Sequence, residues 1–200
     1  RVERELGRGG AGTVFLALDQ ALGRRVALKV YHRRGRIERE RLRAEARTPA
    51  QLEHPGVVRI FDIDERLVAV AMEAVSGGSV RRELSRGAVP LERAQRWLAT
   101  AAEALAFIHD GGVVHRDVKP SNFLLRGDDR VVSTDFGLAT PRGEVPLAGR
   151  GGLGEGTLQY MPPEQKLNAV AEPAADVYAF GASMQDLLAA YDADPSATAI

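Results

Sequence analysis

The residues best suited to chemistry lie within one short stretch, residues 115–122. It reads His-Arg-Asp-Val-Lys-Pro-Ser-Asn and places a carboxylate at Asp117, a cation at Lys119 and an amide at Asn122. Phosphoryl transfer from a magnesium nucleotide uses three such groups: a carboxylate that orients the acceptor, a cation beside the phosphates, and an amide oxygen for the metal. The alternative interpretation of this stretch by itself is a charged loop in front of a strand.

A further carboxylate, Asp135, follows in the sequence Asp-Phe-Gly. An isolated acid of this kind is not informative, but shortly after Asn122 it provides a second oxygen ligand for Mg²⁺. The sequence therefore predicts a magnesium site formed by Asn122 and Asp135.

A glycine-rich stretch near the start of the chain is suited to holding phosphates. Residues 7–12 read Gly-Arg-Gly-Gly-Ala-Gly, and glycines allow a backbone to approach phosphate oxygens closely. A dinucleotide-binding fingerprint requires a helix directly after the glycines, whereas residues 13–16 (Thr-Val-Phe-Leu) favour a strand. We therefore expect a flap between two strands, and a plain glycine-rich turn is the alternative.

Lys29 ends an apolar run, residues 26–29, that follows the flap. A lysine at the end of a strand usually lies at the surface, but behind a phosphate flap its ammonium can point at the α- and β-phosphates. Such a lysine needs a carboxylate to hold it. Glu45 on the following predicted helix is the best candidate, and Glu38 and Glu40 are its rivals.

Two more motifs complete the series, residues 156–164 (Gly-Thr-Leu-Gln-Tyr-Met-Pro-Pro-Glu) and residues 176–181 (Asp-Val-Tyr-Ala-Phe-Gly). Either one alone is compatible with a loop or with the start of a helix. Six motifs in this order are not expected by chance.

The elements that position these motifs change in character along the chain. The first third consists of short β-rich runs with one segment rich in Glu, Arg, Leu and Ala, which favour helix. The predicted strands are Val14–Leu18, Arg25–Val30, Val57–Phe61 and Leu67–Met72, and the predicted helix is Ile37–Ala46. Gly77-Gly78 is the expected hinge. Beyond it, apolar residues recur at helical spacing from Leu91 to Ile108, and a second apolar helix is expected at about 174–191. The pattern predicts an α+β fold with a small β-rich lobe and a larger, mainly helical lobe.

Composition excludes several classes of function. The 27 Lys and Arg residues balance 27 Asp and Glu residues, so no basic excess indicates binding to nucleic acid or to an anionic membrane. The absence of Cys excludes disulfides, zinc thiolate sites and thiol nucleophiles. No apolar run approaches the roughly 18 residues that cross a bilayer. We expect a cytoplasmic excerpt of a longer protein, with any membrane anchor outside this segment.

The series of motifs resembles the eukaryotic-type protein kinases, from Arg1 to about Ala190. Lys119, two residues after Asp117, and Thr157 ahead of Pro163 resemble the Ser/Thr branch, and the loops resemble a bacterial member. The resemblance implies the bilobal protein-kinase fold over residues 1–200, with an N-lobe and hinge at 1–75 and a partial C-lobe at 76–200 that lacks its last helices.

The resemblance also implies ATP and Mg²⁺ as cofactors, proteins bearing Ser or Thr as substrates, and transfer of the γ-phosphate to their hydroxyl groups. Asp117 would orient the hydroxyl and accept its proton, Lys29 would pair with Glu45, and Asp176 would anchor the catalytic loop from beneath. The residues that it assigns to nucleotide binding are Leu6, Gly7, Gly9, Gly12, Val14, Ala27, Lys29, Met72, Glu73, Val75 and Leu124, with Met72 as gatekeeper and Glu73 to Val75 as hinge.

A departure from the family pattern and a few positions relevant to substrate preference bear on function. Pro49 follows Glu45 by four residues, lacks the N–H that would bond its carbonyl, and predicts that the helix ends or kinks there. A pseudokinase, which binds nucleotide without transfer, is therefore the alternative function. Ser79 and Ser121 occupy positions where relatives that prefer basic substrates carry acids, with Asp186 as a possible third acid, so a strong demand for Arg in the substrate is not expected.

Overall fold

The computed structural model describes residues 1–145, 158–167 and 170–192. Within these ranges, the side chains of residues 41, 44, 45, 47–51 and 190–192 lie outside the description.

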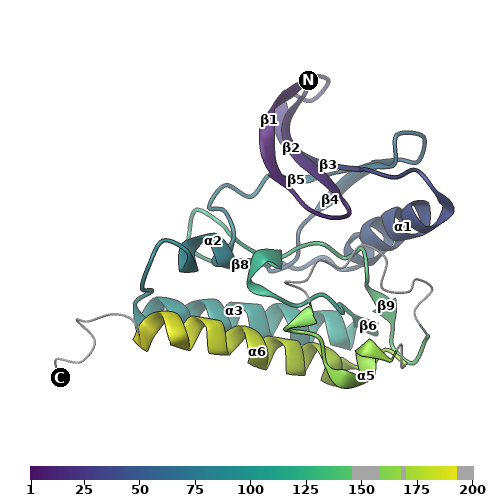
Figure 1. Cartoon of the computed structure of the whole chain (residues 1–200). Helices are drawn as coiled ribbons and strands as arrows, with labels where there is room; N and C mark the ends of the chain where they lie inside the picture. The colour runs from purple at the N-terminus through teal and green to yellow at the C-terminus, as the bar shows by residue number, and fades with distance from the viewer. Residues whose placement is uncertain (146–157, 168–169, 193–200) are drawn as a thin grey trace.

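An antiparallel sheet of five strands forms the N-terminal part (Figure 1). Its strands are β1 (Val2–Arg8), β2 (Gly12–Asp19), β3 (Arg24–Tyr31), β4 (Ile60–Asp64) and β5 (Ala69–Glu73), in the spatial order β1-β2-β3-β5-β4. The first three strands are joined in sequence as expected for hairpins, and β5 then pairs with β3, opposite Ala27 and Lys29. Lys29 is therefore held in the middle of the sheet, on the strand beside the glycine flap.

The strand β4 begins and ends later than the sequence predicts. Val57 and Val58 are buried outside the sheet, where Val57 bridges to Ser133. The polar Asp62 and Asp64 belong to β4 because this strand lies at the sheet edge, where polar side chains can face solvent.

Helix α1 (Arg36–Gln51) lies beside the sheet and contacts β4 and β5. It continues two residues past Pro49, so the expected end of the helix before this proline is wrong. Proline removes one backbone hydrogen bond, but its fixed φ is compatible with helix. Leu42, Ala46 and Leu52 are buried along this segment, and their packing holds the last turn in place.

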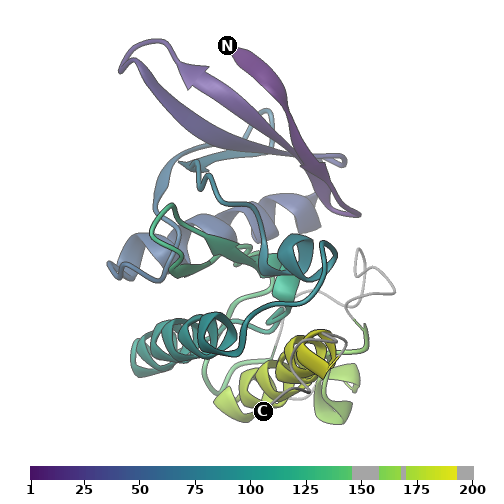
Figure 2. The same cartoon turned by 90° about the vertical axis from the view of Figure 1, so that its left-hand side faces the viewer.

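The C-terminal part is mainly helical. Its long helices are α3 (Leu91–Asp110) and α6 (Pro173–Asp192), which lie side by side in Figures 1 and 2. Helix α3 buries residues at three- and four-residue spacing, namely Ala94, Trp97, Ala101, Ala104, Leu105 and Ile108. This face confirms the apolar periodicity predicted from Leu91 to Ile108.

Short elements fill the space between the long helices and the sheet. They are α2 (Val80–Leu84), β6 (Val113–Val114), the 3₁₀ turn η1 (Pro120–Asn122), β7 (Phe123–Leu125), β8 (Val131–Ser133), β9 (Thr140–Pro141) and α5 (Pro163–Lys166). Strand β6 pairs with β9, and β7 pairs with β8. The two predicted catalytic motifs lie in the loop before η1 and in the loop after β8. The strand pairs β6–β9 and β7–β8 therefore fix the position at which each motif begins.

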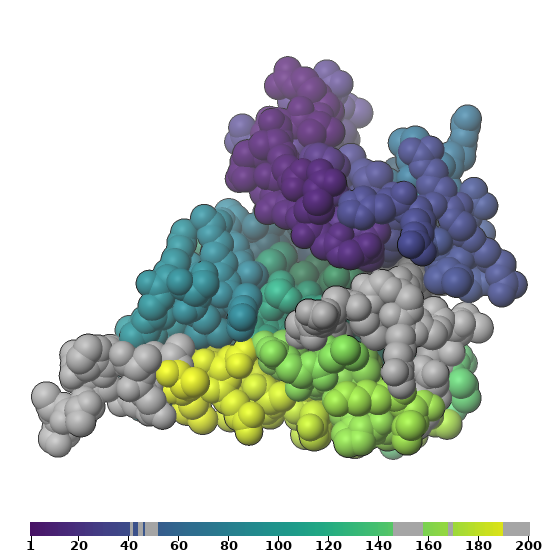
Figure 3. Space-filling model, in the orientation of Figure 1, coloured from purple at the N-terminus to yellow at the C-terminus, as the bar shows by residue number. Residues whose placement is uncertain are grey.

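The two parts of the chain meet along the segment between β5 and α2. Figure 3 shows the sheet and α1 forming the upper part of the molecule and the helices the lower part. The Gly77 N–H donates to the Leu125 carbonyl at 2.8 Å, and the space that a Cβ at Gly77 would need is taken by Leu125. This arrangement confirms the α+β fold with a β-rich N-lobe. Among the described residues, no helix combines the length and the hydropathy needed to cross a membrane.

An ion pair also joins the two parts at the hinge. Arg126, which follows β7, donates to both carboxylate oxygens of Glu73 at 3.0 and 2.8 Å and to the Pro55 carbonyl at 2.7 Å. Two parallel hydrogen bonds to a carboxylate are stronger than a single contact. This fork therefore fixes the end of β5 to the helical part.

We predict that Arg126→Met lowers the free energy of unfolding by about 1–3 kcal/mol, because the half-buried Glu73 carboxylate loses its two guanidinium hydrogen bonds and keeps only the 3.5 Å contact from the Arg59 N–H. Urea denaturation measures this change. Arg130→Met is the matched control, since Arg130 makes one 3.4 Å contact with Asp128 and both side chains are more than half exposed. Its expected change is within about 0.5 kcal/mol. Equal effects of the two substitutions would contradict the role of the fork.

Candidate active site

A cleft of about 500 Å³ opens between the flap of the sheet and the loops above α3 and α6. Its lining brings together predicted residues from four distant motifs: Gly7, Gly9, Gly12, Val14, Lys29, Asp117, Lys119, Asn122 and Asp135. Six other predicted residues are not among the described residues that line it. The phosphate-handling and catalytic candidates thus share one space.

The glycine stretch forms a flap between β1 and β2, as predicted. The Gly9 N–H donates to the Gly12 carbonyl at 2.9 Å, which closes the turn. Gly12 begins β2 opposite Tyr31, and a Cβ there would collide with the Val30 carbonyl. Gly12 is therefore required by the sheet itself, whereas Gly7 and Gly9 face open space.

Asp176, fully buried at the start of α6, anchors the loop that precedes Asp117. Its two oxygens accept the backbone N–H groups of His115 and Arg116, both at 2.7 Å, and His109 Nε2 contacts the carboxylate at 2.8 Å. Arg116 has a left-handed backbone with φ of 66°, a conformation costly for a residue with a Cβ. The buried carboxylate offsets that cost, and the predicted anchoring by Asp176 is confirmed.

His115 links the two catalytic motifs. The Asp117 N–H donates to His115 Nδ1 at 3.3 Å, so this ring nitrogen is an acceptor and Nε2 carries the proton. Nε2 then donates to the Thr134 carbonyl at 3.1 Å, and the ring packs against Phe136 at 4.6 Å between centroids. His115 therefore serves as a packing and hydrogen-bonding link.

The carboxylate of Asp117 is held from two sides. Lys119 Nζ donates to its oxygens at 2.9 and 2.8 Å, and Asn122 Nδ2 donates to Oδ2 at 2.8 Å and to the Asp117 carbonyl at 2.9 Å. Because the amide nitrogen is used in this way, Asn122 Oδ1 is left to accept. The loop presents one buried carboxylate and one amide oxygen to the cleft.

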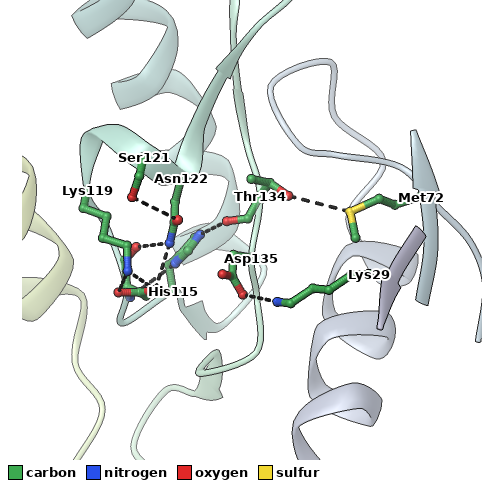
Figure 4. Close-up of polar contacts among 9 residues, drawn as sticks. Lys29, Met72, His115, Lys119, Ser121, Asn122, Thr134 and Asp135 are labelled. Atoms are coloured by element: carbon green, nitrogen blue, oxygen red, sulfur yellow. Dashed lines mark hydrogen bonds and ion pairs between the residues drawn. The ribbon is translucent and has the colours of Figure 1, made fainter. Parts of the chain in front are cut away.

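Lys29 meets Asp135 across the cleft, with 2.7 Å between Nζ and Oδ1 (Figure 4). Burial opposes ionisation of Asp135, but the charge of Lys29 and its hydrogen bond outweigh it, so the pKa of Asp135 lies below its ordinary value. Asp135 has a left-handed backbone with φ of 66°. The carboxylate is therefore ionised at neutral pH, as a metal ligand must be.

The predicted partner of Lys29 lies outside the described residues, because the side chain of Glu45 is not part of the description. Its backbone belongs to α1. Of the two rivals, Glu40 Oε1 lies 3.5 Å from Arg36 Nε on the same helix, and Glu38 is half-buried. The pairing of Lys29 with Glu45 stays a prediction.

Six residues that the sequence assigns to the adenine end do not line the cleft: Leu6, Ala27, Met72, Glu73, Val75 and Leu124. Ala27 and Met72 are buried directly opposite each other on β3 and β5. The Met72 sulfur lies 3.9 Å from Thr134 Oγ1, next to Asp135. Glu73 is committed to Arg126, and Leu6 is exposed on β1.

Sequence reasoning missed several residues that line the cleft, among them Tyr31, Arg81, Gln159 and Tyr160. Gln159 and Tyr160 lie inside the predicted motif at 156–164. The sequence therefore marked this stretch as functional, although it did not assign a role to either residue. Arg81 had none, because a short helix rich in Arg gives no indication of which side chain faces a cleft.

The donor set fits Mg²⁺ bound together with a polyphosphate. Among the described residues, no group of three or more His, Cys, Asp or Glu side chains is placed to hold a metal by itself. Asn122 and Asp135 offer two hard oxygen ligands from neighbouring loops, since the Thr134 N–H donates to the Asn122 carbonyl at 3.0 Å, and Mg²⁺ is commonly held by one or two such groups plus phosphates. Lys29 and Lys119 supply positive charge beside them.

Comparison with known proteins agrees with this geometry. The protein kinase domain family matches residues 1–195. This chain belongs to the protein kinase family. It is 41% identical over 192 residues to the serine/threonine-protein kinase PknA of Mycobacterium tuberculosis, covering 90% of this chain and 44% of that protein. It is 39% identical to serine/threonine-protein kinase pkn2 of Myxococcus xanthus (90% and 23%) and 35% identical to the probable serine/threonine-protein kinase pknA2 of Bifidobacterium longum (100% and 28%).

These relatives confirm the predicted family, the eukaryotic-type protein Ser/Thr kinases, and its predicted bacterial branch. Members of the family use ATP and generally Mg²⁺. The chain spans less than half the length of the curated relatives that it matches.

We predict that Asp176→Ala lowers the free energy of unfolding by about 2–5 kcal/mol, because two buried backbone N–H groups lose their acceptor. Denaturation with urea measures the loss. Glu172→Ala serves as the control, since Glu172 pairs with Arg142 at the surface. A change in Asp176→Ala as small as that of the control would refute the anchoring role.

We predict that Lys29→Met raises the pKa of Asp135, since burial remains while the neighbouring charge is lost. In the wild type, the ionised carboxylate contributes stability that is present above about pH 4 and is lost as the pH falls through the lowered pKa. Carbon NMR of the Asp carboxylates between about pH 2 and pH 7 follows both variants. Lys29→Arg keeps the charge and should keep the pKa low; an unchanged pKa in Lys29→Met would contradict the assignment.

Proposed function

We propose that this chain is a protein Ser/Thr kinase domain that transfers the γ-phosphate of ATP to a Ser or Thr hydroxyl of a protein. The observation that carries the proposal is the position of Asp117, held by Lys119 and Asn122 in the same cleft as the Lys29–Asp135 pair. The domain would run over residues 1–200, with an N-lobe and hinge at 1–75 and a partial C-lobe at 76–200.

In the proposed reaction, Asp117 orients the substrate hydroxyl and accepts its proton. The hydroxyl oxygen forms a bond to the γ-phosphorus, the bond from that phosphorus to the β,γ-bridging oxygen breaks, and ADP leaves with the electron pair. Lys119 stays beside Asp117 and offsets charge on the transferring group. Bound Mg²⁺ would neutralise charge on the β- and γ-phosphates, with Asn122 and Asp135 as its ligands.

Lys29 has two roles in this proposal. Its ammonium binds the α- and β-phosphates, and its neighbour Asp135 is kept ionised by it. Glu45 would hold Lys29 in place. The flap at residues 7–12 would cover the phosphates with backbone N–H groups, because no side chain at Gly7 or Gly9 stands in the way.

The nucleotide base would lie next to the hinge, enclosed by the apolar side chains of Leu6, Val14, Ala27 and Leu124. Met72 would close the inner end, and the backbone from Glu73 to Val75 would hydrogen-bond the base. Ala27 and Met72 support this placement by facing each other across β3 and β5.

A pseudokinase is the second candidate function. Its usual mark is the loss of the nucleotide lysine, the catalytic carboxylate or the metal carboxylate, and Lys29, Asp117 and Asp135 are all present in one cleft. The helix that carries Glu45 continues past Pro49, which removes the main reason for favouring this alternative. We also propose a cytoplasmic location, protein substrates, and no nucleic-acid or membrane contact within this segment.

The test is phosphate transfer from radiolabelled Mg·ATP to a generic protein substrate and to the chain itself. Asp117→Ala should reduce the rate by on the order of 10³-fold or more, because positioning and charge supply most of the rate acceleration. Acid hydrolysis of the product should release phosphoserine or phosphothreonine. Asp128→Ala, at an exposed turn, should leave the rate unchanged.

The outcome that would overturn the kinase proposal is a folded wild-type chain that binds ATP and transfers no label. The pseudokinase function would then replace it. Label that persists in Asp117→Ala at the wild-type rate would instead reject Asp117 as the catalytic residue.

A further inference from the structure

Arg81 is a cleft residue that the proposed phosphate transfer does not use. It lies on α2 and lines the same cleft as Asp117, Lys119 and Tyr160. Its side chain is 58% exposed, and its ion pair with Asp186 is a single contact of 3.3 Å from Nη1 to Oδ2. A guanidinium has five N–H donors, so this contact leaves most of them available at the cleft.

The partner of Arg81 is already engaged by a stronger donor. Tyr160 donates its hydroxyl to the same Asp186 oxygen at 2.5 Å. Burial and this hydrogen bond raise the pKa of Tyr160 to about 12, so the phenol remains a donor at neutral pH. Asp186 therefore has two protein partners, and the expectation that it serves as a third acid for a basic substrate is not supported by its surroundings.

The rest of the cleft, as far as the described residues form it, offers no carboxylate to a basic substrate. Among the described residues that line it, the acids are Asp117 and Asp135, both assigned to the transfer itself. Ser121 lines the cleft, whereas Ser79 caps α2 by accepting the Arg82 N–H at 3.2 Å. Where an acid would attract a cationic side chain, this chain has a neutral hydroxyl and an exposed arginine.

We propose that Arg81 selects protein substrates that carry Asp or Glu close to the acceptor Ser or Thr. The inference rests on the proposed kinase function and adds the substrate class. A substrate carboxylate would bind the free edge of the guanidinium with two parallel hydrogen bonds, which favours it over the single contact that Asp186 makes. Asp186 would keep its bond to Tyr160, so the exchange leaves no buried charge without a partner.

The weakness of the existing pair makes this exchange favourable. An exposed, single-contact ion pair contributes little stability, so little is lost when Arg81 turns to the substrate. A basic substrate side chain would face Arg81 and Lys119 at close range, and like charges at an interface oppose binding. The same side chain thus attracts one class of peptide and rejects the other.

The test uses peptides with one Thr acceptor in which Glu, Gln or Arg is placed in turn at each of the five positions on either side. For the wild type we expect at least one position where kcat/KM for Glu exceeds that for Arg by about tenfold or more. Arg81→Ala should reduce that ratio to within about threefold, and Arg81→Glu should invert it. The KM for ATP should stay the same in both variants.

Arg82→Glu is the matched control. Arg82 is the next residue on the same helix and is also exposed, but it is not among the residues that line the cleft. It changes the net charge of the chain by the same amount as Arg81→Glu. Its peptide preference should equal that of the wild type, which separates a local contact from a general effect of charge.

Two results would overturn this inference while leaving the kinase proposal intact. One is a wild type that phosphorylates Glu and Arg peptides at equal kcat/KM at every position. The other is an acidic preference that Arg81→Glu and Arg82→Glu change to the same extent. Absence of transfer to any peptide, with ATP bound, would instead reject the kinase function on which the inference rests.

Discussion

The geometry of the site depends on one buried carboxylate. Asp176 accepts hydrogen bonds from the backbone N–H groups of both His115 and Arg116. Removal of this buried acid would leave both N–H groups without an acceptor. This constraint holds Arg116 in a left-handed conformation that its side chain disfavours. From that bend the chain reaches Asp117, whose N–H returns to His115, and through His115 the constraint extends to Thr134 and the neighbouring Asp135 motif. One interaction below the cleft therefore orients both of the loops that carry its carboxylates.

The charges of the cleft are arranged as neighbouring pairs of opposite sign. Lys29 lies against Asp135, and Lys119 lies against Asp117. Each lysine stabilises a carboxylate that would otherwise be penalised by partial burial. Arg81 and Asp186 form a third pair at the edge of the same space, weaker and more exposed.

The sequence predicted those features that depend on local pattern. Helix α3 follows from its apolar spacing, and the flap follows from glycines placed before a β-rich run. Predictions failed where tertiary packing decides. Pro49 remains within α1 because buried neighbours hold the helix, and the polar residues of β4 are accommodated by a sheet edge that the pattern cannot reveal. The engagement of Asp186 by Tyr160 and Arg81 joins three segments, so no single stretch of sequence contains it.

The contacts that create the site are also long-range in sequence. Lys29 and Asp135 are separated by 106 positions, and Arg116 and Asp176 by 60. Bringing such distant residues together costs chain entropy, and that cost is offset only once the contact has formed. During synthesis, the ribosome releases every predicted catalytic residue before it releases Asp176. A nascent chain that pauses ahead of α6 therefore contains all of the predicted catalytic residues but lacks the carboxylate that supports the bend at Arg116. The geometry for transfer is completed only after that helix emerges.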